Sequence, residues 1–484
     1  MSEPEALVLG VDSSTQSTKV LAMDLASLES VAIARAPHSG LSTQDPRDWW
    51  SALKMAVGDL AIDRSRVVGI SVAGQQHGFV QLNAAGEPVC PAPLWNNTDA
   101  ALDADRLNRL ANFPEAVGSS LVASFTIAKL ALAARTSSAD FARTAAICLP
   151  HDYVTRKLTG QLTSDRSDAS GSGWWSPSSG SDRRDLIELA TGADFAERVE
   201  LATVLGSDQI AGTLLPEAAA DLGLPADIPV GPGAGDNAAA ALGIGATTTD
   251  LVISLGTSGV LFAVCDSPTA DPSGEVCGFA DASDRFLPLV CMINCTRAVD
   301  TIAAVFNLGT ADALELAGRI DPGSEGLWML PYFGGERTPN LPRATGHFYG
   351  MTQTNVRSDL MIRAAVDGVA AGLAYCRDAL MRLGIERSTV TLVGGGSRHA
   401  TWQQAIADAI EMPVTVRGGE EHCARGAALQ IAAIVRGQSL LALAREAQPE
   451  TVASIDPRSE FRAAFRADER NALIAELKQK SGSA

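Results

Sequence analysis

Cysteine and positive charge are both scarce in this 484-residue sequence. Its eight cysteines form no CxxC pair, which argues against a zinc site and against a disulfide framework. Cys291 and Cys295 are spaced to share one helix face. No histidine or further cysteine lies near them in the sequence, so we interpret them as small buried hydrophobic residues. Lys and Arg total 38 against 56 Asp and Glu, and the net charge of −18 disfavours binding to nucleic acid or to anionic membranes.

The sequence also lacks three signals that would indicate its compartment or its nucleotide chemistry. No apolar run reaches the roughly 18 residues that a membrane span needs. Residues 1–12 carry acidic side chains and lack the basic segment of a secretory signal peptide, so we expect a cytoplasmic protein. No GxxxxGK[ST] motif occurs, so if the protein binds ATP, it does not use a Walker A loop to do so.

Helix-like and strand-like segments alternate along the chain, which indicates α/β architecture. With 484 residues, 46% of them hydrophobic, the chain is long enough for two large lobes. The expected helices cover residues 49–60, 99–110, 359–383 and 401–410, the expected strands cover 67–73 and 391–393, and an amphipathic helix with a solvated charged face is expected at 460–478.

A strand, a polar turn and a return strand occur twice, about half the chain apart. The first set covers residues 7–11, 13–18 and 20–23, and the second covers 251–255, 256–259 and 260–264. The repetition suggests two similar lobes, although two unrelated hairpins would give the same pattern. Turns rich in Gly and Ser can bind phosphate through backbone N–H groups, but each turn taken singly is more often an ordinary turn. Hydroxyl donors are available from Thr15, Ser17, Thr257 and Ser258.

Asp236 follows a Gly-rich turn at 231–235 and opens an Ala-rich helix. One interpretation makes it the N-cap of that helix. A second reads Gly233, Gly235 and Ala238 as a dinucleotide fingerprint, but Asp250 precedes the next strand instead of ending it, so the acid that would bind the ribose is missing. A third makes Asp236 a general base that deprotonates a sugar hydroxyl as the hydroxyl attacks a phosphate.

Polar and aromatic side chains also follow two apolar segments. Gln76 and His77 come after the strand at 67–73, and Trp95 and Asn96 come after a proline-rich turn. Amide and imidazole groups can bond to sugar hydroxyls, and an indole can pack on the C–H face of a polyol. Each of these residues is, on its own, more often a core residue, but together with Asp236 they indicate a sugar site.

Taken in order, these motifs resemble the FGGY family of carbohydrate kinases from residue 7 to residue 434. The segments that carry the resemblance are 10–17, 74–78, 94–96, 149–153, 165–171, 235–237, 255–259, 331–339 and 394–397. The resemblance implies an α/β protein with a duplicated actin-like, ribonuclease-H-like fold of two lobes. It implies a sugar-binding N-terminal lobe at 5–246 that carries the catalytic Asp, an ATP-binding C-terminal lobe at 247–440 and a helical segment at 441–484.

The resemblance also implies roles for individual residues. Asp236 would be the catalytic base, and Asp12 and Asp236 would hold Mg²⁺. The expected sugar contacts are Gln76, His77, Trp95, Asn96, Asp236 and Asn237. The expected ATP contacts are Thr15, Gln16, Ser17, Gly256, Thr257, Ser258, Gly395, Gly396 and Ser397. The implied partners are Mg-ATP and a small sugar, and a homodimer is left open.

The acceptor that the resemblance implies is D-xylulose, phosphorylated at its C5 hydroxyl. Three residues depart from the pattern of the family members that use this sugar. Gln76 stands where Met is usual, and Asn97 and Asp99 stand where Asp and then Arg are usual. Ribulose, gluconate and erythritol are therefore alternative acceptors. An actin-like ATPase that regulates a partner and a catalytically silent sugar sensor are the alternatives outside sugar phosphorylation.

Overall fold

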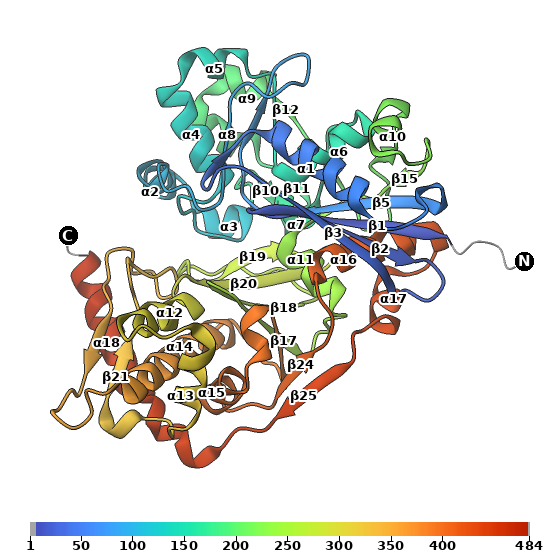
Figure 1. Ribbon diagram of the computed structural model, residues 1–484. Helices are drawn as coiled ribbons and strands as arrows, with labels where there is room; N and C mark the ends of the chain where they lie inside the picture. The colour runs from blue at the N-terminus through green and yellow to red at the C-terminus, as the bar shows by residue number, and fades with distance from the viewer. Residues whose placement is uncertain (1–5, 483–484) are drawn as a thin grey trace, which may run out of the picture.

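The computed structural model describes residues 6–482 and has two lobes, each built around a mixed β-sheet (Figure 1). Residues 1–5, which include the acidic start of the chain and the first residue of the expected N-terminal lobe, lie outside the described residues. The upper lobe in Figure 1 contains the blue to green first half of the chain, and the lower lobe contains most of the yellow to red second half. Within residues 6–482, no helix is both long enough and apolar enough to cross a membrane.

The strands of both sheets form where the sequence has apolar runs that end in glycine or polar turns. The first sheet has the order β14-β15-β5-β1-β2-β3, and β16 also pairs with β5. Its strands are β1 (Leu7–Ser13), β2 (Ser17–Asp24), β3 (Ser30–Pro37), β5 (Val67–Gly74), β14 (Gly212–Thr213), β15 (Pro229–Val230) and β16 (Ala234–Gly235). The second sheet has the order β19-β20-β18-β17-β23-β24-β25. Its strands are β17 (Asp250–Leu255), β18 (Gly259–Ala263), β19 (Cys277–Ala280), β20 (Phe286–Met292), β23 (Thr389–Val393), β24 (Val414–Arg417) and β25 (Thr451–Ile455).

The two sheets repeat the same pairing pattern. In the first, β3, β2 and β1 are antiparallel neighbours, β1, β5 and β15 are parallel, and β14 returns antiparallel. In the second, β20, β18 and β17 are antiparallel, β17, β23 and β24 are parallel, and β25 returns antiparallel. The prediction of a duplicated two-lobed fold is therefore confirmed, and coincidence between unrelated hairpins is excluded.

The predicted helices also form, and their ends differ from the prediction by at most three residues. They are α1 (Pro46–Asp59), α2 (Ala101–Leu110), α14 (Ser358–Met381) and α15 (Ala400–Ile410). Helix α1 begins earlier than expected because the Asp45 side chain accepts a hydrogen bond from the backbone of Arg47 and Pro46 occupies the first turn.

Helix α16 (His422–Arg436) packs against both β1 and α11 (Asp236–Gly243), although it lies far from them in the sequence (Figure 1). Glycines allow this close approach. A Cβ atom on Gly10 would lie 1.9 Å from the carbonyl oxygen of Ala424, and one on Gly426 would lie 1.8 Å from that of Ala239. A larger residue at either position would push the helix away from the sheet that carries the candidate site.

The expectation for the C-terminal helix is wrong in two respects. A 3₁₀ helix, η4 (Ser459–Phe465), and helix α18 (Ala467–Gly482) replace the single helix expected at 460–478, because Arg466 adopts a left-handed backbone conformation with φ 50° and ψ 49°. The charged face is also not simply solvated. Arg470 is buried and donates to the carbonyl of Met329, and Lys478 lies 2.5 Å from the buried carboxylate of Glu275.

Cys291 and Cys295 do not share a helix face. Cys291 lies in β20 and Cys295 precedes α12 (Thr296–Val305). Cys295 is fully buried and Cys291 is half-buried, and both are free thiols. Their interpretation as buried packing residues therefore holds for Cys295 and only partly for Cys291.

Candidate active site

The loops that the sequence analysis singled out leave the first sheet at one edge. Ser13 at the end of β1 lies opposite Gly74 at the end of the parallel strand β5. Gly235 at the end of β16 also pairs in parallel with Gly74. Because carboxyl ends of parallel strands share an edge, the loop at 14–16, the Gln76-His77 loop and Asp236 start side by side.

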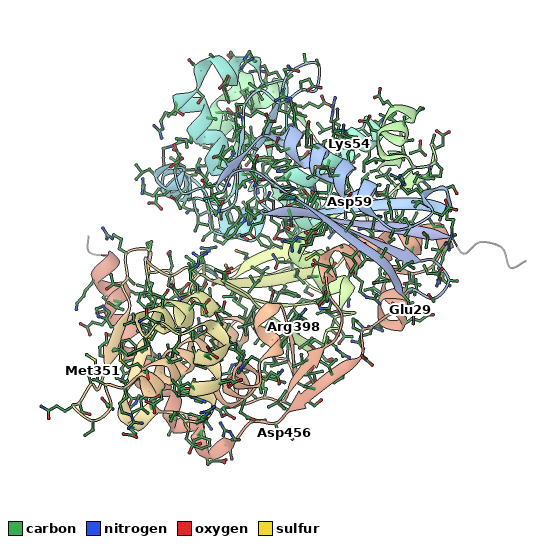
Figure 2. The ribbon with its side chains drawn as sticks, viewed as in Figure 1. Glu29, Lys54, Asp59, Met351, Arg398 and Asp456 are labelled. Atoms are coloured by element: carbon green, nitrogen blue, oxygen red, sulfur yellow. The ribbon has the colours of Figure 1, made fainter. Side chains whose placement is uncertain are left out.

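The second sheet repeats this arrangement for the other two predicted phosphate or nucleotide loops. Ser254 near the end of β17 lies opposite Val393 at the end of β23, so the turn at 256–258 and η3 (Gly395–Arg398) leave the same edge. Figure 2 shows Arg398, the last residue of η3, on the lower lobe. Its side chain points to Glu420, with 2.7 Å between the guanidinium and the carboxylate.

Asp236 is the first residue of α11, and Gly235 before it is the N-cap. The interpretation of Asp236 as the helix N-cap is therefore wrong. Its Oδ1 accepts hydrogen bonds from the backbone N–H and the side-chain amide of Asn237, at 2.8 and 2.9 Å. Burial, helped by the negative charge of Asp12, raises the pKa of Asp236 to about 7. A carboxyl group with this pKa can take up a proton near neutral pH.

Asp12 is buried near the end of β1. Its Oδ2 accepts a hydrogen bond from Nζ of Lys19 at 3.3 Å, and Lys19 also lies 2.6 Å from Glu421, the residue before α16. The other oxygen, Oδ1, is buried and has no hydrogen-bond partner among the described residues. Burial raises the pKa of Asp12 even though Lys19 opposes the shift. A buried carboxylate oxygen without a partner fits a cation ligand.

The first predicted phosphate loop, residues 14–17, is closed by hydrogen bonds from the backbone N–H and hydroxyl of Ser14 to the carbonyl of Ser17. Gln16 is exposed, Thr15 is half-buried and Ser17 is buried. The three predicted ATP contacts in this loop thus differ in their access to solvent, and Gln16 is the most open of them.

The second predicted phosphate loop, residues 256–258, is tied to the start of α12. The carbonyl of Gly256 accepts hydrogen bonds from the backbone N–H and the hydroxyl of Thr296, and Thr257 is exposed. In η3 the hydroxyl of Ser397 donates to the carbonyl of Gly394 at 2.7 Å. A Cβ atom on Gly395 would meet nothing within 4 Å, so open space lies beside this backbone. Gly396 instead packs against Leu255.

Gln76 links the Gln76-His77 loop to Asp236. The Asn237 side chain donates to Oε1 of Gln76 at 3.3 Å, and Nε2 of Gln76 donates to the carbonyl of Ser167 at 3.3 Å. Three of the predicted sugar contacts, Gln76, Asp236 and Asn237, therefore form one hydrogen-bonded group.

His77 has a left-handed backbone conformation, with φ 66°. Lys129 and Thr126 of α4 (Thr126–Thr136) hold this conformation by donating to its carbonyl oxygen at 2.9 and 3.2 Å. Burial lowers the pKa of His77 to about 3, so the ring is neutral. Its Nδ1–H donates to the carbonyl of Gly171 at 2.8 Å, which leaves Nε2 as an acceptor for a hydroxyl group.

Residues of both lobes meet at the His77 ring. Its centroid lies 4.8 Å from that of Phe125 in the first lobe and 5.7 Å from that of Phe279 in β19 of the second sheet. The backbone N–H of Gly278 in β19 also donates to the carbonyl of Gly118 at 2.9 Å. The predicted sugar loop therefore lies where the two lobes contact each other.

Trp95 and Asn96 form no hydrogen bond to the group of Gln76, Asp236 and Asn237 in the part of the chain that the structure describes. The indole N–H of Trp95 donates to Oγ1 of Thr15 at 2.8 Å, so it contacts the first phosphate loop. The amide of Asn96 donates to the carbonyl of Leu41 at 3.0 Å. Asn97 and Asp99 bond to each other, with 3.1 Å between the Asn97 amide and the Asp99 carboxylate.

Models of the N-terminal and C-terminal domains of the FGGY family of carbohydrate kinases match residues 7–243 and 251–435. The chain belongs to this family. The resemblance inferred from the motifs is confirmed, and the chain is a carbohydrate kinase, a phosphotransferase with the actin-like fold.

Relatives of this FGGY kinase extend along nearly its whole length. A xylulose kinase of Streptomyces rubiginosus is 40% identical over 448 residues, which is 91% of this chain and 90% of the relative. A xylulose kinase of Escherichia coli K12 is 34% identical over 445 residues, 88% of this chain and 90% of the relative. The crystal structure of xylulose kinase from Bifidobacterium adolescentis superposes with a TM-score of 0.85 at 34% identity, covering 96% of this chain and 99% of that one.

The kinase also contains a buried charge cluster to which the sequence analysis gave no role. His151 in α6 (Pro150–Thr159) is fully buried, and its Nδ1 lies 2.7 Å from Oδ2 of Asp168. Its Nε2 lies 3.3 Å from Asp152 and 3.7 Å from Asp165. Burial alone would lower the pKa of His151, but the three carboxylates raise it to about 10, so the ring carries a positive charge at neutral pH.

This cluster supports the backbone in front of Asp236. Asp165 accepts hydrogen bonds from the backbone N–H and the hydroxyl of Ser167, and that hydroxyl in turn accepts from the N–H of Gly235 at 2.9 Å. A Cβ atom on Gly233 would lie 2.5 Å from the ring of His151. The sequence signal was present in the motifs at 149–153 and 165–171, but nothing in their spacing showed that they meet.

Replacing the buried Lys129 by Met tests how the His77 loop is held. Lys129→Met removes the ammonium that donates to the His77 carbonyl, so we expect the free energy of unfolding to fall by about 1–3 kcal/mol. We also expect the KM for the sugar to rise about tenfold, because His77 then loses a contact that fixes its left-handed backbone. Chemical denaturation and steady-state kinetics measure the two effects.

The matched control is Lys54→Met on α1, where the half-buried Lys54 lies on the upper lobe (Figure 2) and pairs with Asp221 at 3.4 Å, away from the His77 loop. We expect this variant to stay within about 0.5 kcal/mol of the wild type. An unchanged sugar KM in Lys129→Met would show that the His77 loop does not depend on this contact.

Proposed function

We propose that this FGGY kinase transfers the γ-phosphoryl group of ATP to the C5 hydroxyl of D-xylulose. The observation that carries the choice of sugar is the 40% identity to a xylulose kinase over 91% of the chain. The hydrogen-bonded group of Gln76, Asn237 and Asp236 supports a polyol acceptor, because amide and carboxylate groups can bind neighbouring hydroxyls in one orientation.

In this proposal Asp236 is the general base. The sugar hydroxyl oxygen forms a bond to the γ-phosphorus, the bond between that phosphorus and the β-γ bridging oxygen breaks, and ADP leaves with the electron pair. The hydroxyl proton passes to the Asp236 carboxylate, whose pKa of about 7 suits it to accept a proton at neutral pH. Gln76, His77 and Asn237 hold the sugar, and Nε2 of the neutral His77 ring accepts a hydrogen bond from a sugar hydroxyl.

The residues of the site fit Mg²⁺, with Asp12 and Asp236 as the carboxylates that would hold it. Asp12 offers a buried oxygen without a hydrogen-bond partner among the described residues, and its charge is near enough to Asp236 to help raise the pKa of that carboxyl group. Mg²⁺ commonly binds one or two carboxylates together with substrate phosphates, and it would neutralise phosphate charge here.

We assign the phosphates of ATP to the two turns and the adenosine to η3. Thr15, Gln16 and Ser17 would face the γ-phosphate, and residues 256–258 would face the other phosphates. The open space beside Gly395 supports the placement of adenosine next to residues 395–397. A homodimer is proposed from the resemblance alone, and light scattering at several protein concentrations tests it.

The test of the proposed function is sugar-dependent ADP formation from Mg-ATP with D-xylulose, L- and D-ribulose, D-gluconate, glycerol and erythritol. We expect kcat/KM for D-xylulose to exceed that for each other compound by about tenfold or more. A preference for another polyol would overturn the choice of sugar and implicate Gln76, Asn97 and Asp99. ATP hydrolysis that does not respond to any sugar would overturn the proposal as a whole.

A further inference from the structure

Trp95 makes a direct contact with the first phosphate loop across 80 positions of sequence. Its indole N–H donates to Oγ1 of Thr15 at 2.8 Å, although the Trp95 side chain itself is 40% exposed. An indole N–H can only donate, so the Thr15 hydroxyl must accept in this bond through a lone pair. The hydrogen of that hydroxyl is then free to donate elsewhere, and donation to a phosphate oxygen is strengthened because the hydroxyl already accepts a hydrogen bond.

The backbone of Thr15 is held from the same side. The amide of the buried Gln44 donates to the Thr15 carbonyl at 2.7 Å, and its Oε1 accepts from the indole of Trp49 at 2.7 Å. Gln44 belongs to β4 (Thr43–Gln44), which pairs antiparallel with β7 (Ala92–Pro93), the strand just before Trp95. The β4–β7 ribbon therefore contacts the main chain of Thr15, and Trp95, which follows the ribbon, contacts its side chain.

The β4–β7 ribbon is also tied to the loop that carries Gln76 and His77. The backbone N–H of Phe79, two residues after His77, donates to the carbonyl of Pro93 at 3.0 Å. The N–H of Leu94 donates to the carbonyl of Ser42 at 2.9 Å, which holds the ribbon together beyond its paired residues. A continuous set of hydrogen bonds thus leads from the sugar-side loop through the ribbon to the phosphate loop.

We propose that Trp95 is a positioning residue for phosphoryl transfer, whose N–H orients the Thr15 hydroxyl toward the γ-phosphate and makes that orientation depend on the sugar-side loop. The inference deepens the proposed function and rests on it. It differs from the expectation in the sequence analysis, where the Trp95 ring packs on the sugar. A sugar platform needs the ring face, whereas the positioning role needs the N–H.

Trp95→Phe separates the two roles, because it keeps an aromatic face and removes the N–H. We expect kcat to fall about five- to tenfold, the loss that one hydrogen bond made in the transition state accounts for, while the sugar KM stays within about twofold. We also expect the ratio of sugar-independent ATP hydrolysis to sugar phosphorylation to rise, because the Thr15 hydroxyl is no longer oriented by the indole N–H. A wild-type kcat in Trp95→Phe, together with a raised sugar KM in Trp95→Leu, would overturn the proposal in favour of a sugar platform.

The matched control is Trp328→Phe. Trp328 in β21 (Trp328–Leu330) lies in the second lobe, away from Thr15, and stacks there on Tyr349 with ring centroids 4.4 Å apart. This variant should keep wild-type kinetics. A second variant, Gln44→Met, removes the hydrogen bond to the Thr15 carbonyl. Like Trp95→Phe, it should lower kcat without raising the sugar KM.

Wild-type turnover of the sugar panel tests the proposed function, and the ratio of variant to wild type on whichever sugar is phosphorylated tests Trp95. If the wild type phosphorylates none of these sugars, calorimetric binding of Mg-ATP decides the question. Binding about threefold or more weaker in Trp95→Phe than in Trp328→Phe would support the contact between Trp95 and the phosphate loop. Equal binding in the two variants would overturn it.

Discussion

Asp236→Asn is expected to lower kcat by roughly 10²- to 10⁴-fold while sugar binding stays close to that of the wild type. The asparagine has nearly the same shape, and its side-chain oxygen can still accept from the backbone N–H of Asn237, so the start of α11 is retained. It cannot take the proton from the attacking hydroxyl at neutral pH, because a neutral amide is a far weaker base than a carboxylate with a pKa near 7. Steady-state kinetics with calorimetric sugar binding separates the loss of turnover from a loss of affinity.

The control for Asp236→Asn is Asp59→Asn, at the exposed end of α1 on the upper lobe (Figure 2). It makes the same chemical change far from the candidate site and should leave kcat unchanged. An Asp236→Asn variant with near wild-type turnover would refute the role of Asp236 as the base. A variant that neither binds sugar nor turns over would instead indicate that Asp236 mainly binds the substrate.

The duplicated fold could be predicted because its signal is local. Each hairpin is contained in about twenty residues, and the apolar runs, polar turn and return run all appear within that window at 7–23 and again at 251–264. The structure adds what the local pattern cannot show, namely that the later strands of both sheets repeat the same orientations. A local pattern of the same kind, a Gly-rich turn followed by an Ala-rich helix, correctly predicted that Asp236 lies at the start of a helix.

The expectation of a solvated C-terminal helix failed because of contacts between distant segments. Periodicity at 460–478 indicated one helix, but the helix breaks at Arg466. The buried Arg470 donates to the carbonyl of Met329, and the half-buried Lys478 pairs with the carboxylate of Glu275. From a sequence alone, a charged residue is assigned to the solvent-exposed surface unless its partner in the fold is known. These contacts could be seen only in the folded chain.

The candidate site was predicted in part. Gln76, Asn237 and Asp236 do come together, whereas sugar contact by Trp95 and Asn96 stays a prediction. The link between Trp95 and Thr15 spans 80 positions and has no sequence signature. The cluster around His151 was missed because a buried histidine among three aspartates looks, in a sequence, like two unrelated polar motifs.

His151→Gln is expected to lower the free energy of unfolding by about 3–5 kcal/mol, the usual cost of removing one partner from a buried ion pair. The glutamine is neutral, so the carboxylates of Asp152, Asp165 and Asp168 would lose the charge that offsets them in the interior. Chemical denaturation at neutral pH measures the change. The control is His347→Gln, at the exposed first residue of β22 (His347–Tyr349), which should stay within about 0.5 kcal/mol of the wild type.

The charge of His151 can be tested directly, because its pKa of about 10 in the folded chain lies far above the roughly 6.5 of an unfolded histidine. The stability that this group contributes is therefore complete below about pH 6.5 and is lost as the pH rises through 10. At pH 8 the ring should still carry both protons, which nitrogen NMR of the imidazole detects. A neutral ring at pH 8, or an unchanged stability in His151→Gln, would contradict the charged cluster. A variant that is destabilised but, while folded, keeps the wild-type kcat would show that the cluster stabilises the lobe without positioning Asp236, since the bond from Gly235 to Ser167 would then suffice to hold the loop.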